Sequence, residues 1–177
     1  MYEVDLNTGA ATAIAPIAGG AVVQSLAART INELNFTANE RIVNRLYQDI
    51  LGRAADRGGL AGFASQLNSG ASVASVAAAI AGSPEGRAIR VNELFRRYLG
   101  RNADQGSLDA NVQFLNSGGT DRQIAASILG SAEYFARNGG TNTTFVQALF
   151  RDALGRPVDP ATQASLEARL AAGASRQ

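Results

Sequence analysis

Hydrophobic and polar residues recur with a helical period over most of the chain. Between residues 42 and 50 the apolar side chains lie three or four positions apart, which places them on one face of a helix. The pattern from Thr37 to Glu40 is typical of a capping box, and Gly52 readily takes the left-handed conformation that ends helices. We therefore predict a first helix between Thr37 and Gly52.

Two further helices are predicted before the next repetition of this pattern. Asp56 is placed to cap the second helix, and Gly70 to end it. Ser72 and Gly82 stand in the same places around the third helix. Pro84 then opens another helix, at a position where its missing N–H costs nothing. The apolar residues expected to face inward in the second and third helices are Leu60, Phe63, Leu67, Val73, Val76, Ala77 and Ile80.

This order of helices is an internal repeat. When the chain is shifted by 48 positions, residues 43–85 align with residues 91–133 without a gap, and 20 of the 43 pairs are identical. A third copy begins at Val146. The helical region, residues 37–177, thus consists of repeat one (37–84), repeat two (85–138) and repeat three (142–177), which stops before its third helix.

The repeat predicts a mainly α fold of stacked three-helix units, with about eight or nine short helices in all. Because repeat three has no third helix, we expect either a truncated unit or a groove filled by another segment. An exposed apolar groove at that place would favour a homodimer.

The N-terminal segment, residues 1–36, has a different pattern. Tyr2, Val4 and Leu6 alternate with acidic residues, and a turn at residues 7–9 leads into a second extended stretch that reaches Ile17. This predicts a short β-hairpin followed by a linker or short helix over residues 18–36. Since a lone hairpin is marginally stable, it needs a sheet or a helical surface to pack on.

The amino-acid composition excludes many classes of catalytic and metal-binding chemistry. The chain has 177 residues, and its 16 basic residues are all Arg, so Lys is absent along with Cys, His and Trp. Without these side chains there are no thiol nucleophiles, imidazole bases or ligands, Schiff bases or Walker lysines. We therefore expect no enzyme activity and no cofactor. The net charge of +1 is too balanced for a nucleic-acid binder.

Neither a membrane span nor a signal peptide is expected from the sequence. The apolar residues 10–28 are interrupted by Pro16 and a pair of glycines, so no unbroken stretch of about 18 apolar residues exists. The residues in front of this stretch are acidic, whereas a signal peptide begins with basic ones.

A Gly-Arg-x-x-Asp motif follows the first helix of every repeat. We consider a repeated loop that binds an ion or a sugar, but favour a local role. Glycine would end one helix, aspartate would cap the next, and arginine would lie near the carbonyl end of the first helix. The motif residues are Gly52, Arg53 and Asp56, then Gly100, Arg101 and Asp104, then Gly155, Arg156 and Asp159.

Other acidic residues give weak signals. Asn102, Asp104 and Asp109 come closest to a calcium loop, but they supply too few closely spaced oxygen ligands, so we expect no dedicated metal site. Glu85 and Glu133 occupy equivalent repeat positions at helix starts, where a carboxylate stabilises the positive end of the helix dipole.

A run of arginines marks the first helix of repeat two. Residues 41–177 carry 15 Arg against 11 acidic residues, and an anionic polysaccharide is a conceivable partner for the run. A solvated helical face is the simpler interpretation. The residues of this candidate partner-binding face are Arg87, Arg90, Arg96 and Arg97.

The helical region resembles a known family. Leu-Gly-Arg-x-x-Asp, an apolar helix ending in Leu-x-x-Gly, and the Ile-Leu-Gly-Ser-Ala-Glu-Tyr sequence of residues 128–134 are together similar to domain of unknown function 4214, over about residues 40–177. The resemblance implies an α-helical module of a large secreted or surface-attached bacterial protein, without an established activity. It extends distantly to the linker domains of phycobilisomes, which are assembly scaffolds. The family commonly has Trp at the positions of Phe63, Asn111 and Leu166.

The N-terminal segment weakly resembles one repeat of the secreted β-rich family called domain of unknown function 4394. The matching positions are Tyr2, Val4, Asp5, Thr8, Gly9, Ala10 and Thr12. This resemblance implies that residues 1–36 are the tail of a larger β-rich domain.

Residues and resemblances together favour a non-catalytic helical interaction module, secreted or at the cell surface, that binds a protein or polysaccharide of the cell envelope. An intracellular assembly scaffold like the phycobilisome linkers is the first alternative. A calcium-dependent binding module is the second.

Overall fold

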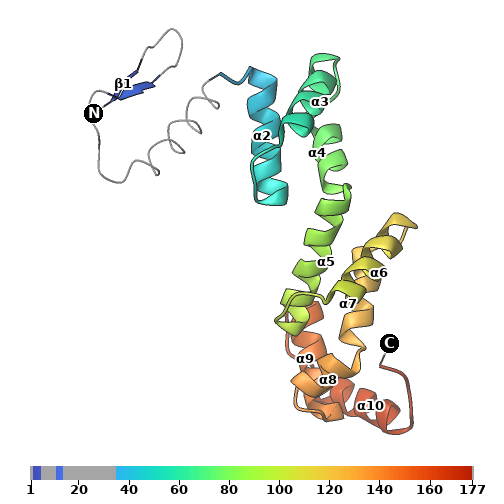
Figure 1. Ribbon diagram of the computed structural model, residues 1–177. Helices are drawn as coiled ribbons and strands as arrows, with labels where there is room; N and C mark the ends of the chain where they lie inside the picture. The colour runs from blue at the N-terminus through green and yellow to red at the C-terminus, as the bar shows by residue number, and fades with distance from the viewer. Residues whose placement is uncertain (1, 5–10, 14–34, 177) are drawn as a thin grey trace. The chain divides into compact units, whose positions relative to one another are not determined.

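The computed structural model describes residues 2–4, 11–13 and 35–176. The chain divides into two compact bodies, residues 1–80 and 81–177, which we describe separately. The described residues form nine helices and two three-residue strands, so the predicted mainly α fold is confirmed (Figure 1).

The two strands lie near the N-terminus. Strand β1 (Tyr2–Val4) pairs antiparallel with β2 (Ala11–Ala13), and Tyr2 lies opposite Ala13. The predicted turn at residues 7–9, the rest of the extended stretch to Ile17 and the linker over 18–34 lie outside the described residues.

The first body holds the three helices of repeat one. Helix α2 (Ala38–Leu51) begins at the predicted capping box, in which the Glu40 carboxylate accepts from the Thr37 backbone N–H at 2.7 Å. Helices α3 (Arg57–Asn68) and α4 (Val73–Ala81) follow.

The core of the first body brings all three helices together. Its buried residues come from one face of α2, from α3 and from α4: Val43, Tyr47, Ala64, Val76 and Ile80. Val73 does not join them, although the sequence predicted that it would. It is the first residue of α4 and remains 45% exposed, because the inward face of this short helix begins one turn later.

The second body holds repeats two and three. Helix α5 (Pro84–Leu99) is followed by α6 (Gln105–Asn116), α7 (Asp121–Leu129) and the short α8 (Ala132–Arg137). Helices α9 (Asn142–Leu154) and α10 (Pro160–Ala171) complete it.

The start of repeat two and the start of repeat three differ by seven inserted residues. In repeat two the sequence that begins at Pro84 runs on as one helix to Leu99. In repeat three the equivalent stretch breaks into α8 and α9 at Gly139 and Gly140, whose φ angles are 89° and 66°. Two consecutive left-handed residues cannot continue a helix, so the insertion turns the chain here.

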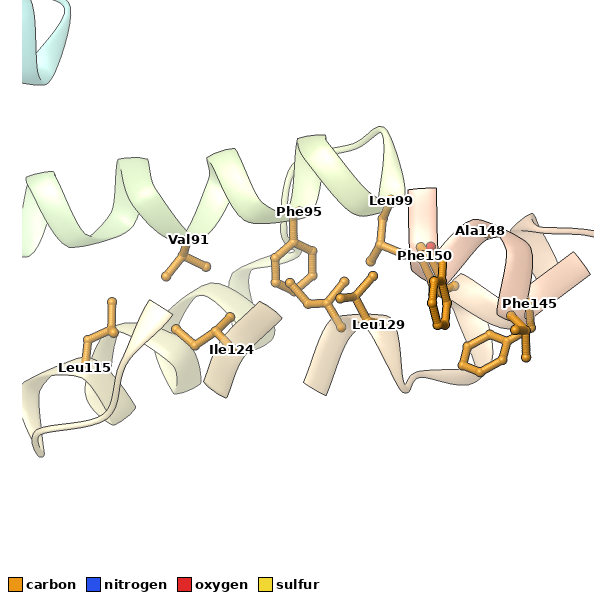
Figure 2. Close-up of a cluster of buried hydrophobic side chains, with 12 residues drawn as sticks. Val91, Phe95, Leu99, Leu115, Ile124, Leu129, Phe145, Ala148 and Phe150 are labelled. Atoms are coloured by element: carbon orange, nitrogen blue, oxygen red, sulfur yellow. The ribbon is translucent and has the colours of Figure 1, made fainter. Parts of the chain in front are cut away.

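The core of the second body is a continuous cluster shared by both repeats. Figure 2 shows Val91 and Phe95 on α5 directed toward Ile124 and Leu129 of α7, and Leu99 lying near Phe150 of α9. The cluster buries an isoleucine pair on α7, Ile124 and Ile128. Burial of such side chains is the main stabilising term in a domain of this size.

Candidate functional site

The Gly-Arg-x-x-Asp motif builds the same helix junction three times. Gly52, Gly100 and Gly155 end α2, α5 and α9 with φ angles of 70°, 65° and 66°. Each cap donates its backbone N–H to the carbonyl four residues earlier. The chain can therefore leave each helix in the same direction, since only glycine takes this conformation without strain.

The motif aspartates are N-caps, as the local interpretation predicted. Each carboxylate accepts from the backbone N–H three residues later, at 2.8, 2.9 and 2.9 Å. These backbone hydrogen bonds lower the pKa of all three carboxyl groups. The donor N–H groups belong to Gly59, Ser107 and Thr162, and the aspartates are Asp56, Asp104 and Asp159.

The motif arginines fold back over an aromatic ring of the preceding helix. Their guanidinium carbons lie 5.3, 5.5 and 5.2 Å from ring centroids at equivalent repeat positions. Each Nη1 also donates to the carbonyl of the next residue. The planar guanidinium group thus covers the aromatic ring and also holds the loop in place. The pairs are Arg53 with Tyr47, Arg101 with Phe95, and Arg156 with Phe150.

Arg101 has a further partner that sequence reasoning missed. Its Nε and Nη2 donate to the two carboxylate oxygens of Glu133, both at 2.6 Å. Glu133 lies in the first turn of α8, as expected, but it also ties α8 to the junction after α5. The hydrogen bonds from Arg101 lower the pKa of Glu133. The signal was the recurrence of Glu at positions 85 and 133.

An asparagine side chain holds the junction loop in repeats one and two, and it is buried in repeat one and half-buried in repeat two. The Oδ1 atoms of Asn44 and Asn92 accept from the backbone N–H groups of Ala55 and Ala103, each at 3.0 Å. Sequence reasoning missed this contact as well. An asparagine repeated on an otherwise apolar helix face was the available sign, because buried amides need partners.

A polar network in the second body runs from the buried Tyr134 to the exposed Arg151. Tyr134 is fully buried, and its hydroxyl donates to Asp152 Oδ2 at 2.7 Å. Arg151 donates to both oxygens of the same carboxylate. Burial raises the pKa of Tyr134 above its ordinary range, whereas the hydrogen bonds from Arg151 lower the pKa of Asp152.

The predicted arginine face is brought together only in part. Arg87 and Arg90 line a hollow of about 530 Å³ together with Arg122, a residue that the sequence prediction did not include. Arg90 Nη1 lies 3.7 Å from Asp121 Oδ2, and Arg87 donates to Asn116 Oδ1.

The other two arginines of the predicted face have different surroundings. Arg96 donates to Asn102 Oδ1 at 3.1 Å. The Arg97 guanidinium lies over the ring of Tyr98, 5.3 Å from its centroid. Neither lines the hollow that Arg87 and Arg90 share.

The side chains considered as calcium ligands each accept hydrogen bonds from a different residue. The Asp104 carboxylate accepts from Ser107, and Asp109 accepts from Gln105 at 2.8 Å. Asn102 accepts from Arg96 at 3.1 Å. Among the described residues, no three His, Cys, Asp or Glu side chains gather closely enough to hold a metal ion.

The junctions described above correspond to a known family. The family model described as a domain of unknown function, DUF4214, matches residues 24–89 and 125–177, more than half of the chain. The chain belongs to the DUF4214 family. The match to DUF4214 covers all of repeat one and the three helices α8 to α10. It leaves out residues 90–124, which the resemblance from sequence had included.

Two further observations complete the comparison of this DUF4214 chain. Neither the curated proteins nor the solved structures give a match. Over the part of the chain that the structure describes, no helix is both long and apolar enough to cross a membrane.

Proposed function

We propose that this chain is a non-catalytic helical interaction module of a secreted or cell-surface bacterial protein. It binds a protein or polysaccharide partner of the cell envelope through the outer surfaces of its helices. Absence of Cys, His and Lys from the sequence supports a role outside catalysis, because the usual nucleophiles and bases are missing.

The threefold junction is the observation that carries this proposal. In all three copies the arginine lies on an aromatic ring and the aspartate caps a helix, so the motif side chains serve the fold. A repeated scaffold of this kind provides extended helical surfaces, which repeat proteins use for binding.

The charges on one surface indicate which kind of partner would fit it. The hollow with Arg87, Arg90 and Arg122 presents three guanidinium groups and one carboxylate, that of Asp121. Arginine forks match carboxylate and phosphate groups geometrically, so an anionic envelope polymer or an acidic protein segment suits this surface.

Co-sedimentation with the cell-envelope fraction of the producing organism tests the proposal. The whole chain is mixed with envelopes at low and high salt, with and without EDTA. We expect saturable binding that weakens at high salt, since exposed charges are screened. Binding that is lost in EDTA would instead support the calcium-dependent alternative.

A charge-reversal variant sharpens the test. Arg122→Glu changes an exposed residue of the hollow and should weaken envelope binding. Arg45→Glu is the matched control, because Arg45 is 73% exposed on α2 and does not line the hollow. An absence of binding under every condition would refute the envelope proposal and favour an intracellular scaffold.

A further inference from the structure

Repeat two contains a cavity of about 240 Å³ where α5, α6 and α7 meet. Its apolar lining belongs to the core of the second body and includes Phe95 on α5 and Ile128 on α7. The rest of the lining is polar, with Asn111 on α6 half-buried and Ser127 on α7 exposed. Because an exposed residue lines it, the cavity reaches the surface, and a small molecule can enter it.

Repeat one has an aromatic ring in the equivalent place. A shift of 48 positions aligns Asn111 with Phe63, whose side chain packs against the core of the first body. The ring of Phe63 meets that of Tyr47 edge-on, with 6.2 Å between the ring centroids. Tyr47 aligns with Phe95, which lines the cavity. An asparagine therefore stands in repeat two where repeat one packs a ring.

A second exchange between the two repeats keeps its own space filled. In repeat one the Tyr47 hydroxyl lies where a Cβ atom on Gly59 would stand. Repeat two has Phe95 and Ser107 at these positions, so the lost hydroxyl is offset by a gained side chain. Among the described residues that line the cavity, Phe95 is the single aromatic one. The ring of Phe63 is thus the group that repeat two does not replace.

Asn111 determines which polar group a ligand must carry. Its Nδ2 donates to the backbone carbonyl of Ser107 at 2.8 Å. A carbonyl oxygen can only accept, so this bond identifies the other amide atom, Oδ1, as the acceptor that remains. In the part of the chain that the structure describes, no group donates to this Oδ1. A ligand that bonds to it must therefore supply a hydroxyl or an N–H.

The charged groups of the lining neutralise each other. Arg101 and Glu133 both line the cavity and form an ion pair, with 2.6 Å between Nη2 and Oε2. The Nη1 of Arg101 donates to the carbonyl of Asn102. Neither charge is left over for an ion, and an unpaired ion would be costly to remove from water. A neutral ligand suits the cavity better than an anion or a cation.

We propose that this cavity binds a small, neutral aromatic molecule that carries one hydroxyl or ring N–H, such as indole or phenol. The ring lies against Phe95 and Ile128, and the donor bonds to Asn111 Oδ1. An apolar cavity of about 150 Å³ already holds benzene, so one of about 240 Å³ has room for a larger ring system. This site is separate from the outer helical surfaces of the proposed function.

Indole fluorescence measures binding to the whole chain. The chain contains no Trp, so the emission of added indole can be excited selectively. We expect a saturable shift of this emission to shorter wavelength, with a Kd below about 1 mM. Indole should also raise the Tm of the chain, because a ligand that binds only the folded state stabilises it.

Two variants with an added ring locate the site. Asn111→Phe places the residue of repeat one in the cavity and should weaken indole binding at least tenfold. Its Tm should equal or exceed that of the native chain, because the new ring fills the cavity. Gln113→Phe is the matched control, since Gln113 is exposed on the same helix and does not line the cavity. It should leave the Kd unchanged.

A ligand without a donor tests the hydrogen bond to Asn111. N-methylindole keeps the ring but cannot donate, so it should bind the native chain about 2- to 10-fold more weakly than indole. Asn111→Leu removes the acceptor and keeps a side chain of similar size, so this variant should bind the two compounds equally. Equal affinities of the native chain for both compounds would overturn the requirement for a donor.

Three results would overturn the assignment of the cavity. The first is no binding of indole or phenol to the native chain, and the second is indole binding that Asn111→Phe does not weaken. The third is tighter binding of N-acetyl-tryptophanamide than of indole, which would assign the cavity to the side chain of a protein partner. Envelope co-sedimentation that persists beside any of these results would leave the proposed function standing.

Discussion

Removal of one buried hydroxyl should destabilise the second body measurably. Tyr134→Phe deletes the group that donates to Asp152 at 2.7 Å and keeps the ring, which is fully buried and packs edge-on against Phe145. A hydrogen bond to a charged acceptor contributes roughly 1.5–3 kcal/mol. Since Arg151 still donates to the same oxygen, we expect the lower end, about 1.5 kcal/mol.

Thermal unfolding followed by circular dichroism measures this loss. For a body of this size, the expected decrease in Tm is roughly 6–12 °C. Tyr98→Phe is the control, because Tyr98 is half-buried and its ring lies beside Arg97 on the same body. The control should change Tm by no more than about 2 °C, as ordinary surface substitutions do.

The pH dependence gives a second and independent readout. The hydrogen bonds to Asp152 lower its pKa in the folded protein, so they add stability above the unfolded pKa. This stability is lost as the pH falls through the folded pKa. The difference in Tm between native chain and Tyr134→Phe should therefore shrink below about pH 4. Equal Tm values at pH 7, or a difference that grows in acid, would refute the reasoning.

Three further substitutions test the helices and their junctions. Gly62→Ala should raise the free energy of unfolding by about 0.5–1 kcal/mol, because Gly62 lies inside α3 with open space around it. Gly52→Ala should lower the free energy of unfolding by about 1 kcal/mol, because Gly52 has a φ of 70°. Urea unfolding of both variants would show the opposite signs, and a gain at Gly52 would contradict the left-handed cap. Glu133→Gln should lower Tm slightly at pH 7, because it weakens the ion pair with Arg101. The difference in Tm from the native chain should vanish in 1 M salt, and also as the pH falls through the lowered pKa of Glu133.

The helices and their ends could be predicted because their causes are local. Thr37, Asp56 and Ser83 cap helices through hydrogen bonds that span three residues, so a short stretch of sequence contains both partners. The internal repeat then strengthened each assignment, since Gly100 confirms in repeat two what Gly52 indicates in repeat one.

The polar contacts of the candidate site could not be predicted in the same way. Glu133 lies 32 positions after Arg101, and Asp152 lies 18 positions after Tyr134. Pairs at such separations depend on how helices pack, which periodicity leaves open. The repeat itself concealed the second network, because Tyr134 corresponds to a glycine in repeat one.

The exposure of single side chains was equally hard to predict. Val73 has the right spacing for the core but begins its helix, where the neighbouring turn that would cover it is missing. Leu154 repeats the position of Leu99, yet Leu99 is 3% exposed and Leu154 is 58% exposed, because burial depends on packing between helices that periodicity does not specify.

The asparagine braces also set how fast the junctions open to solvent. The backbone amides of Ala55 and Ala103 lie in loops, where exchange with deuterium is normally rapid, but each donates to an asparagine side chain of the preceding helix. In repeat three Gln147 stands in that position and points its side-chain amide toward Gln163 instead. The three junctions have the same helix-ending conformation, yet we expect the third to exchange fastest and to open first of the three.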